Sequence, residues 1–204
     1  MTAAGATAWQ GRGNGLLDRA IRYAVAAAGE VRPELLSHPT PCRGWDLAML
    51  LEHANESLNA LREGFGTGRL GLIPDAPAGE FAADLAREFR DRASWLLDVW
   101  TSTGHQRRVI DIAGRPLEAS VMEAAGALEL AVHGWDISQA CGRFRPVPGG
   151  LAADLLAIAP LVVPEAGRHP LFAAPARAAP GASASDKLAA FLGRSLRAPG
   201  TQPR

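Results

Sequence analysis

The sequence predicts an all-α protein, a four-helix bundle followed by a short, mostly irregular C-terminal extension. Two observations favour the bundle. Four stretches repeat apolar residues at the three-to-four-residue spacing of a helix that is buried on one face. The connections between them are rich in glycine and proline. The alternative, a parallel α/β sheet, needs a series of apolar strands that the sequence lacks.

Each predicted helix has recognisable boundaries. Asp46 is placed to cap the second helix, and the glycines at 64, 66 and 68 are expected to end it. Gly142 is expected to stop the fourth. A short extended piece at 109–112, turning at Gly114, precedes that helix. The predicted helices are 16–30, 47–63, 81–100 and 117–140.

These elements divide the 204 residues into three parts. Residues 1–14 are a glycine- and alanine-rich, flexible N-terminus, and residues 15–142 are the bundle. Residues 143–204 form an extension that packs on the bundle, with short helices expected at 151–159 and 186–196.

Charge and composition exclude several classes of partner. Basic and acidic residues both number 21, so the net charge is zero, which argues against nucleic acid or an anionic membrane surface as partner. The N-terminus lacks the apolar core of a signal peptide, and no apolar run is long enough to span a membrane. We therefore expect a cytoplasmic monomer or homodimer that acts on a small molecule.

The octet ELAVHGWD, residues 129–136, is unusual for an apolar helix. It places Glu129 and His133 four residues apart, so both side chains lie on one face. His53 lies beside the apolar stripe of the second helix and is the natural third member. Bundles build metal sites from Glu and His on facing helices. The pattern predicts a divalent metal site formed by His53, Glu129 and His133.

Two histidines and one carboxylate are a known catalytic zinc set and also suit Fe²⁺, so these residues alone do not separate zinc from iron, nickel or manganese. Three protein ligands leave a coordination position open for chemistry. Each residue also has an ordinary interpretation. Glu-x-x-x-His pairs are common on solvated helix faces, and a lone histidine such as His53 is often only hydrogen-bonded.

The remaining candidates are placed around this site. Asp136, one turn after His133, is expected either to orient that ligand by accepting its ring N–H or an arginine donor, or to be a surface or loop-tethering carboxylate. Cys42 and Cys141 are interpreted as small apolar residues that do not join the metal. The other histidines, interpreted as exposed or in loop contacts, are His38, His105 and His169.

Three stretches together resemble a known family. They are TPCRGWDLAMLLEH from residue 40, ALELAVHGWDISQACG from residue 127 and DKLAAFLGRS from residue 186. The chain resembles the DinB/YfiT-like metalloprotein superfamily over residues 16–196, and more closely its maleylpyruvate isomerase N-terminal-domain-like branch. The resemblance implies a bundle that holds a divalent metal, usually zinc, through His53, Glu129 and His133.

The resemblance also implies classes of reaction. Relatives include mycothiol-dependent maleylpyruvate isomerase and thiol S-transferases, so the first expectation is S-transfer or isomerisation by a metal-activated thiolate, with mycothiol as a candidate cofactor. The isomerase has a further C-terminal domain that helps to hold its thiol, whereas only a short tail follows Gly142 here.

Two alternatives remain open. The first is a metal–water or Lewis-acid enzyme without a thiol (hydrolase, dehydratase, cyclase or isomerase), with Asp136, Glu52 or Glu56 as its base. The second is a non-catalytic metal-binding protein.

Overall fold

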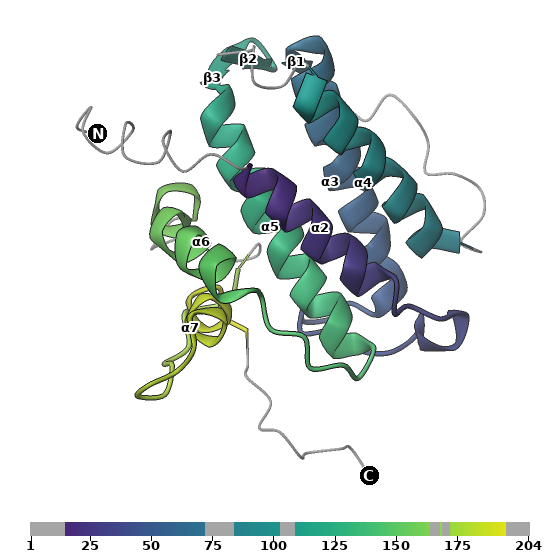
Figure 1. Cartoon of the computed structure of the whole chain (residues 1–204), viewed down its shortest axis with the longest axis vertical. Coiled ribbons are helices and arrows are strands. Elements are labelled where there is room, and N and C mark those ends of the chain that lie inside the picture. Colours follow the sequence, from purple (N-terminus) through teal and green to yellow (C-terminus); the bar gives the residue numbers. More distant parts are fainter. Residues whose placement is uncertain (1–14, 72–83, 103–108, 164–167, 169–171, 195–204) are drawn as a thin grey trace.

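The four expected helices form the bundle in a computed structural model, which describes residues 15–71, 84–102, 109–163, 168 and 172–194 (Figure 1). The fold is mainly helical, as predicted. The prediction for the N-terminus, 1–14, lies outside the described residues. The bundle helices are α2 (Leu16–Ala28), α3 (Leu47–Thr67), α4 (Leu85–Ser102) and α5 (Ala119–Ala140).

Helix α5 is the centre of the molecule. It is buried almost all round, as expected for a helix that is apolar on every side. Its most extensive contact is with α2, and it also packs against α3. The contact with α2 is close at Gly134, where an added Cβ would lie 2.9 Å from Cα of Ala24.

Helix α3 begins as predicted and ends later. The side chain of Asp46 accepts a hydrogen bond from the backbone N–H of Met49 and so caps the helix. The helix continues through Gly64 and Gly66 to Thr67, and Gly68 ends it in the left-handed conformation at φ 78°. Gly64 is a packing residue rather than a stop signal, because an added Cβ would lie 2.5 Å from the terminal methyl carbon of Met122.

A small sheet covers one end of the bundle, at the top of Figure 1. Strand β2 (Val109–Ile112) is the predicted extended piece. It pairs in parallel with β1 (Arg69–Leu70) and in antiparallel with β3 (Arg115–Glu118), after the expected turn at Gly114. Leu117 pairs with Ile110 in this sheet, so α5 begins two residues later than predicted.

The C-terminal extension contains the two expected helices, of which the first is longer than predicted and the second ends earlier, at Phe191. Helix α6 (Gly149–Val162) packs against α5 and α2, and α7 (Ala184–Phe191) packs against α6 (Figure 1). Pro160 lies in the last turn of α6, where it interrupts little of the helix before Val162 ends it. Ser183 caps α7 by accepting from the backbone N–H of Asp186.

The proline-rich loop before α3 contains a single turn of 3-10 helix, η1 (Pro33–Leu35). The third helix was predicted from residue 81, but residues 81–83 lie outside the described part and α4 begins at Leu85. Among the described helices, none has both the length and the apolar character needed to cross a bilayer.

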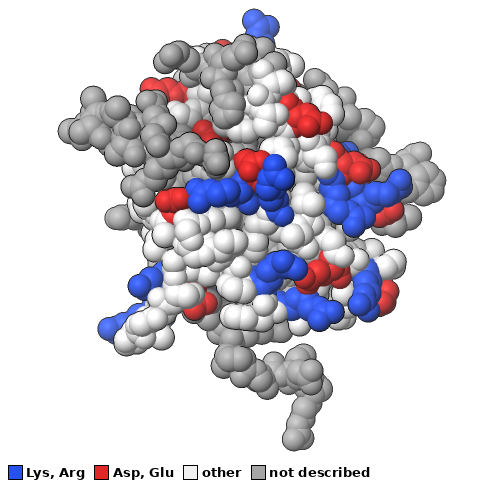
Figure 2. Space-filling model, viewed as in Figure 1, with Lys and Arg blue, Asp and Glu red and all other residues white. Residues whose placement is uncertain are grey.

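Charges are mixed on the molecular surface. On the face shown in Figure 2, basic and acidic side chains lie next to one another rather than in separate fields of one sign. Exposed pairs such as Arg22 with Asp18 and Arg87 with Asp84 account for part of this mixing.

Candidate metal centre

The structure brings the three predicted ligands together at the contact of α3 with α5. One carboxylate oxygen of Glu129, Oε1, lies 2.7 Å from Nε2 of His53 and 3.2 Å from Nε2 of His133. The donor atoms of all three residues lie within 4.8 Å of one another. The spacing on α5 aligns two of them, and the packing of α3 on α5 supplies the third.

Two neighbouring residues support this arrangement, one on α3 and one in the loop just before it. Ser57, one turn after His53, donates its hydroxyl to the same Oε1 of Glu129 at 3.0 Å. The ring of Trp45 packs edge-on against His53, with 5.0 Å between the ring centroids. Sequence reasoning missed Ser57, although its four-residue spacing from His53 was a usable signal.

His133 has a carboxylate at each ring nitrogen. Its Nδ1 lies 3.1 Å from Oδ2 of Asp136, while its Nε2 faces Glu129. A neutral imidazole has a single N–H and cannot donate to both carboxylates. Burial alone would lower the pKa of His133, but Glu129 and Asp136 outweigh it and raise the pKa well above its usual value. The position facing Glu129 therefore calls for a positive charge, either a proton or a cation.

Glu129 is held in its charged form. Burial alone would raise its pKa, but the charges and hydrogen bonds of His133 and His53 hold the pKa well below its usual range. An ionised carboxylate between two imidazoles is a donor set suited to zinc and related divalent ions.

The geometry also fits such an ion. Ligands bonded at about 2.1 Å in a tetrahedral site lie roughly 3.4 Å apart. The observed separations of 2.7 and 3.2 Å need only small side-chain adjustments to reach that value. The side chains of His53 and Glu129 are 37% and 29% exposed, against 9% for His133, so the site is open on the α3 side.

Asp136 is fully buried, so the surface alternative for this residue is wrong. Its Oδ2 faces Nδ1 of His133 and accepts from Nη2 of Arg194 at 2.8 Å, and its Oδ1 accepts from Nε of Arg194 at 3.3 Å. Burial alone would raise the pKa of Asp136, but Arg194 and His133 lower it. The side chain is placed to orient His133.

The interpretation of Cys42 as a small apolar residue is incomplete, because its thiol makes polar contacts beside this site. Its Sγ lies 3.3 Å from Oδ2 of Asp136 and 3.4 Å from Nη2 of Arg194. The loop before α3 folds back on itself, with Thr40 bonded to Trp45 and Pro39 bridged to Asp46, and this carries Cys42 against α5.

The remaining candidates do not join the cluster. Cys141 is half-buried, and burial raises the pKa of its thiol to about 11. Nδ1 of His38 lies 3.1 Å from the carbonyl oxygen of Ala140, which ties the loop to the end of α5. The predictions for His105 and His169 lie outside the described residues.

Comparisons with known proteins agree with this picture. The family model described as the mycothiol maleylpyruvate isomerase N-terminal domain matches residues 17–138. Two proteins of Mycobacterium tuberculosis are each 26% identical over 178 residues, which is 85% of this chain and 92% of theirs: uncharacterized protein MT0763 of strain CDC 1551 / Oshkosh and uncharacterized protein Rv0738 of strain ATCC 25618 / H37Rv. No solved structure matches at a significant level. The matched range contains His53, Glu129 and His133 but not Arg194.

Proposed function

This chain belongs to the family of the mycothiol maleylpyruvate isomerase N-terminal domain, and from that premise we propose that it is a divalent-metal-dependent enzyme that uses a small thiol of the mycothiol type for S-transfer or isomerisation. His53, Glu129 and His133 hold the metal, with zinc as the first candidate. One observation carries the proposal: a single Glu129 oxygen lies between Nε2 atoms from two facing helices.

The residues divide the work between them. When bound, a divalent cation would act as a Lewis acid that lowers the pKa of a thiol and so gives a nucleophile at neutral pH. Glu129 contributes the negative charge of the site, and Ser57 holds the oxygen that faces both histidines. Asp136 keeps the proton of His133 on Nδ1, so that Nε2 is available as a ligand.

The arrangement favours the thiol reaction over metal–water chemistry. A hydrolase or dehydratase needs a general base near the substrate. Of the three candidates, Glu52 and Glu56 are exposed on α3, and both oxygens of Asp136 already accept hydrogen bonds from Arg194. A thiol whose pKa the metal would lower can release its proton to solvent before it reacts, so it needs no such base.

A purely structural metal is less consistent with the donor set. Structural zinc sites are closed by four protein ligands. The nearest further donor, Sγ of Cys42, contacts the Asp136 oxygen that faces Nδ1 of His133, so it lies away from the Nε2 side.

Metal analysis of purified protein tests the ligand set. We expect about one equivalent of metal per chain in the wild type and its loss in His53→Ala, Glu129→Gln and His133→Ala. His38→Gln is the matched control, because His38 only contacts a backbone carbonyl at the end of α5. Retention of metal in the three site variants would refute the assignment.

Cobalt substitution then separates the two reactions. We expect added mycothiol or a simple thiol to produce the intense charge-transfer absorption of a thiolate–cobalt bond. The titration is repeated in Cys42→Ser, so that the protein's own thiol cannot be the source. If no added thiol produces the band, the metal–water alternative replaces this proposal.

A further inference from the structure

We propose that the guanidinium of Arg194 acts as a built-in cation for Cys42 and Asp136, and that it thereby directs the metal to the Nε2 side of His133. This inference rests on the proposed metal centre and assigns a positioning residue to it. Arg194 lies in the C-terminal extension, outside the range that the family model matches.

Two groups of potential metal ligands share His133. The first is His53, Glu129 and His133, and the second is Cys42, His133 and Asp136. In each group the donor atoms lie within 4.8 Å of one another. The second group contains a thiol, which as thiolate is a strong zinc ligand, so donor chemistry alone does not explain why a metal would choose the first.

Arg194 already occupies the second group. Its Nη2 donates to Oδ2 of Asp136 at 2.8 Å and lies 3.4 Å from Sγ of Cys42, and its Nε donates to Oδ1 of Asp136. Both side chains are buried, with exposures of 8% for Arg194 and 0% for Asp136. A metal ion entering this group would displace the guanidinium and leave a buried charge without its partner, which is strongly unfavourable.

The end of α7 fixes the position of Arg194. The backbone N–H of Arg194 bonds to the carbonyl of Ala189, and that of Gly193 bonds to Ala190, which is the Schellman pattern of a helix C-terminus. Gly193 adopts φ 76°, and an added Cβ there would lie 2.7 Å from the carbonyl oxygen of Ala173. Nη1 of Arg194 also donates to the carbonyl of Leu192.

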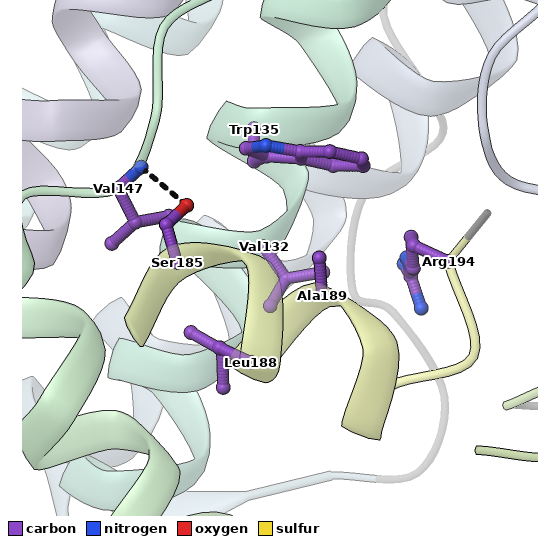
Figure 3. Close-up of a pocket in the computed structure, with 7 residues that line it drawn as sticks. All are labelled: Val132, Trp135, Val147, Ser185, Leu188, Ala189 and Arg194. Atoms are coloured by element: carbon purple, nitrogen blue, oxygen red, sulfur yellow. Dashed lines mark hydrogen bonds between the residues drawn. The ribbon is translucent and has the colours of Figure 1, made fainter. Parts of the chain in front are cut away.

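Packing leaves Arg194 little freedom. Figure 3 shows its side chain beyond the end of α7, at the edge of a small apolar cavity between α7 and α5. Trp135 of α5 and Ala189 of α7 line the same cavity. The end of α7 therefore holds the guanidinium of Arg194 next to Asp136, on the Nδ1 side of His133.

The arrangement fixes which nitrogen of His133 can bind metal. Arg194 donates to Oδ2 of Asp136, the oxygen that faces Nδ1 of His133, so Asp136 is placed to accept the Nδ1–H and the lone pair on Nε2 faces Glu129. Without the guanidinium, the carboxylate of Asp136 has no fixed cation beside it, and Sγ of Cys42 lies 3.3 Å from its Oδ2 as a further donor for a metal ion.

Cobalt binding in the absence of any added thiol tests this inference on the full chain. We expect wild-type protein and Arg194→Lys, which keeps the charge, to bind cobalt without a thiolate charge-transfer band. Arg194→Met keeps most of the side-chain volume and removes the charge, and we expect the band to appear. It should vanish in the double variant Arg194→Met, Cys42→Ser. Circular dichroism checks the fold of each variant, and Arg194→Gln replaces the methionine variant if that one does not fold.

The outcomes separate this inference from the proposed function. An unchanged spectrum in a folded Arg194→Met or Arg194→Gln protein overturns the role of Arg194 and leaves the metal centre intact. A band in the wild type that is lost in Cys42→Ser also overturns it, because Cys42 would then ligate the metal despite Arg194. Failure of the wild type to bind cobalt removes the metal centre itself, and the inference with it.

Discussion

At the scale of single residues, the site depends on how protons and charges are distributed around His133. Its two ring nitrogens face two carboxylates that have different partners: Glu129 meets a second histidine, and Asp136 meets Arg194. The two sides are therefore not equivalent. One carboxylate is already neutralised by a fixed cation, and the other is open toward solvent.

A half-buried carboxyl away from the site gives a prediction about pH. Glu123 of α5 accepts a hydrogen bond from the backbone N–H of Leu17, in the first turn of α2. Burial raises the pKa of Glu123 to about 7, although the bond to Leu17 acts in the opposite direction. The folded protein thus holds a proton that the unfolded chain releases above about pH 4.3, so stability falls as pH rises from there to about 7.

Glu123→Gln keeps an oxygen acceptor for Leu17 and removes the charge. We expect it to stabilise the protein at pH 8 by about 1–2 kcal/mol, after allowance for solvent screening, and to change little at pH 4–5. Urea unfolding at the two pH values measures this. Glu34→Gln, at an exposed position, is the control. A gain of equal size at both pH values would show that ionisation of Glu123 is not the cause.

The sequence predicted part of the site because part of its geometry is local. Glu129 and His133 share a face by helical spacing alone, and the apolar stripe beside His53 indicated which side of its helix faces the bundle. Cys42 contacts Asp136 across 94 residues and Arg194 across 152 residues. No spacing rule covers such contacts, because they depend on how a loop and a helix end pack.

At the scale of elements, close approach between helices depends on glycines whose neighbours differ in flexibility. An added Cβ at Gly134 meets the backbone of Ala24 at 2.9 Å and the ring of Tyr23 at 3.1 Å. At Gly64 both contacts shorter than 3 Å are with the flexible end of Met122, and the side chain of Ile110 lies at an ordinary 3.6 Å. A backbone cannot move aside without moving its helix, whereas a methionine can change rotamer.

Gly134→Ala is therefore expected to destabilise the protein, and Gly64→Ala is its matched control. Overpacking costs about 1–3 kcal/mol, which exceeds the gain of about 1 kcal/mol in helix propensity at Gly134. At Gly64 the propensity gain should offset the cost or exceed it. Chemical denaturation of both variants decides the point, and equal destabilisation would contradict this account of the α2–α5 contact.

The helices themselves were predictable from apolar periodicity, but some of their ends were not. Glycine at 64 is typical of a helix end, yet here it makes room for Met122. Leu117 fits the helical pattern of α5 but pairs with Ile110 in the sheet. In both cases a tertiary contact overrides a local preference.

At the scale of the whole molecule, metal should stabilise the fold because its ligands come from two helices. Binding to the folded state alone adds about 2.7 kcal/mol at a free metal concentration one hundred times Kd. For a chain of this size we expect Tm to rise by about 5–10 °C. Thermal melting with zinc and with a chelator measures the shift, and His53→Ala is the control. The same shift in that variant would place the binding elsewhere.

The C-terminal extension is joined to the bundle by more than apolar packing. Nη2 of Arg19 in α2 donates to Oδ2 of Asp154 in α6 at 2.6 Å, and the hydroxyl of Tyr23 in α2 donates to the carbonyl of Arg145. Through Arg194 the extension also reaches the residues around His133. The extension is therefore a structural part of the site, which its composition did not indicate.

The separation of 58 residues between Asp136 and Arg194 has a consequence during translation. At about 5–20 residues per second, the ribosome adds the arginine roughly 3–12 seconds after the aspartate. A nascent chain thus displays its cysteine, histidine and aspartate before the guanidinium arrives. Under the proposed metal centre, a thiophilic ion that binds in that interval would find both donor groups open, and we expect correct metal binding to depend on α7 packing before the ion binds.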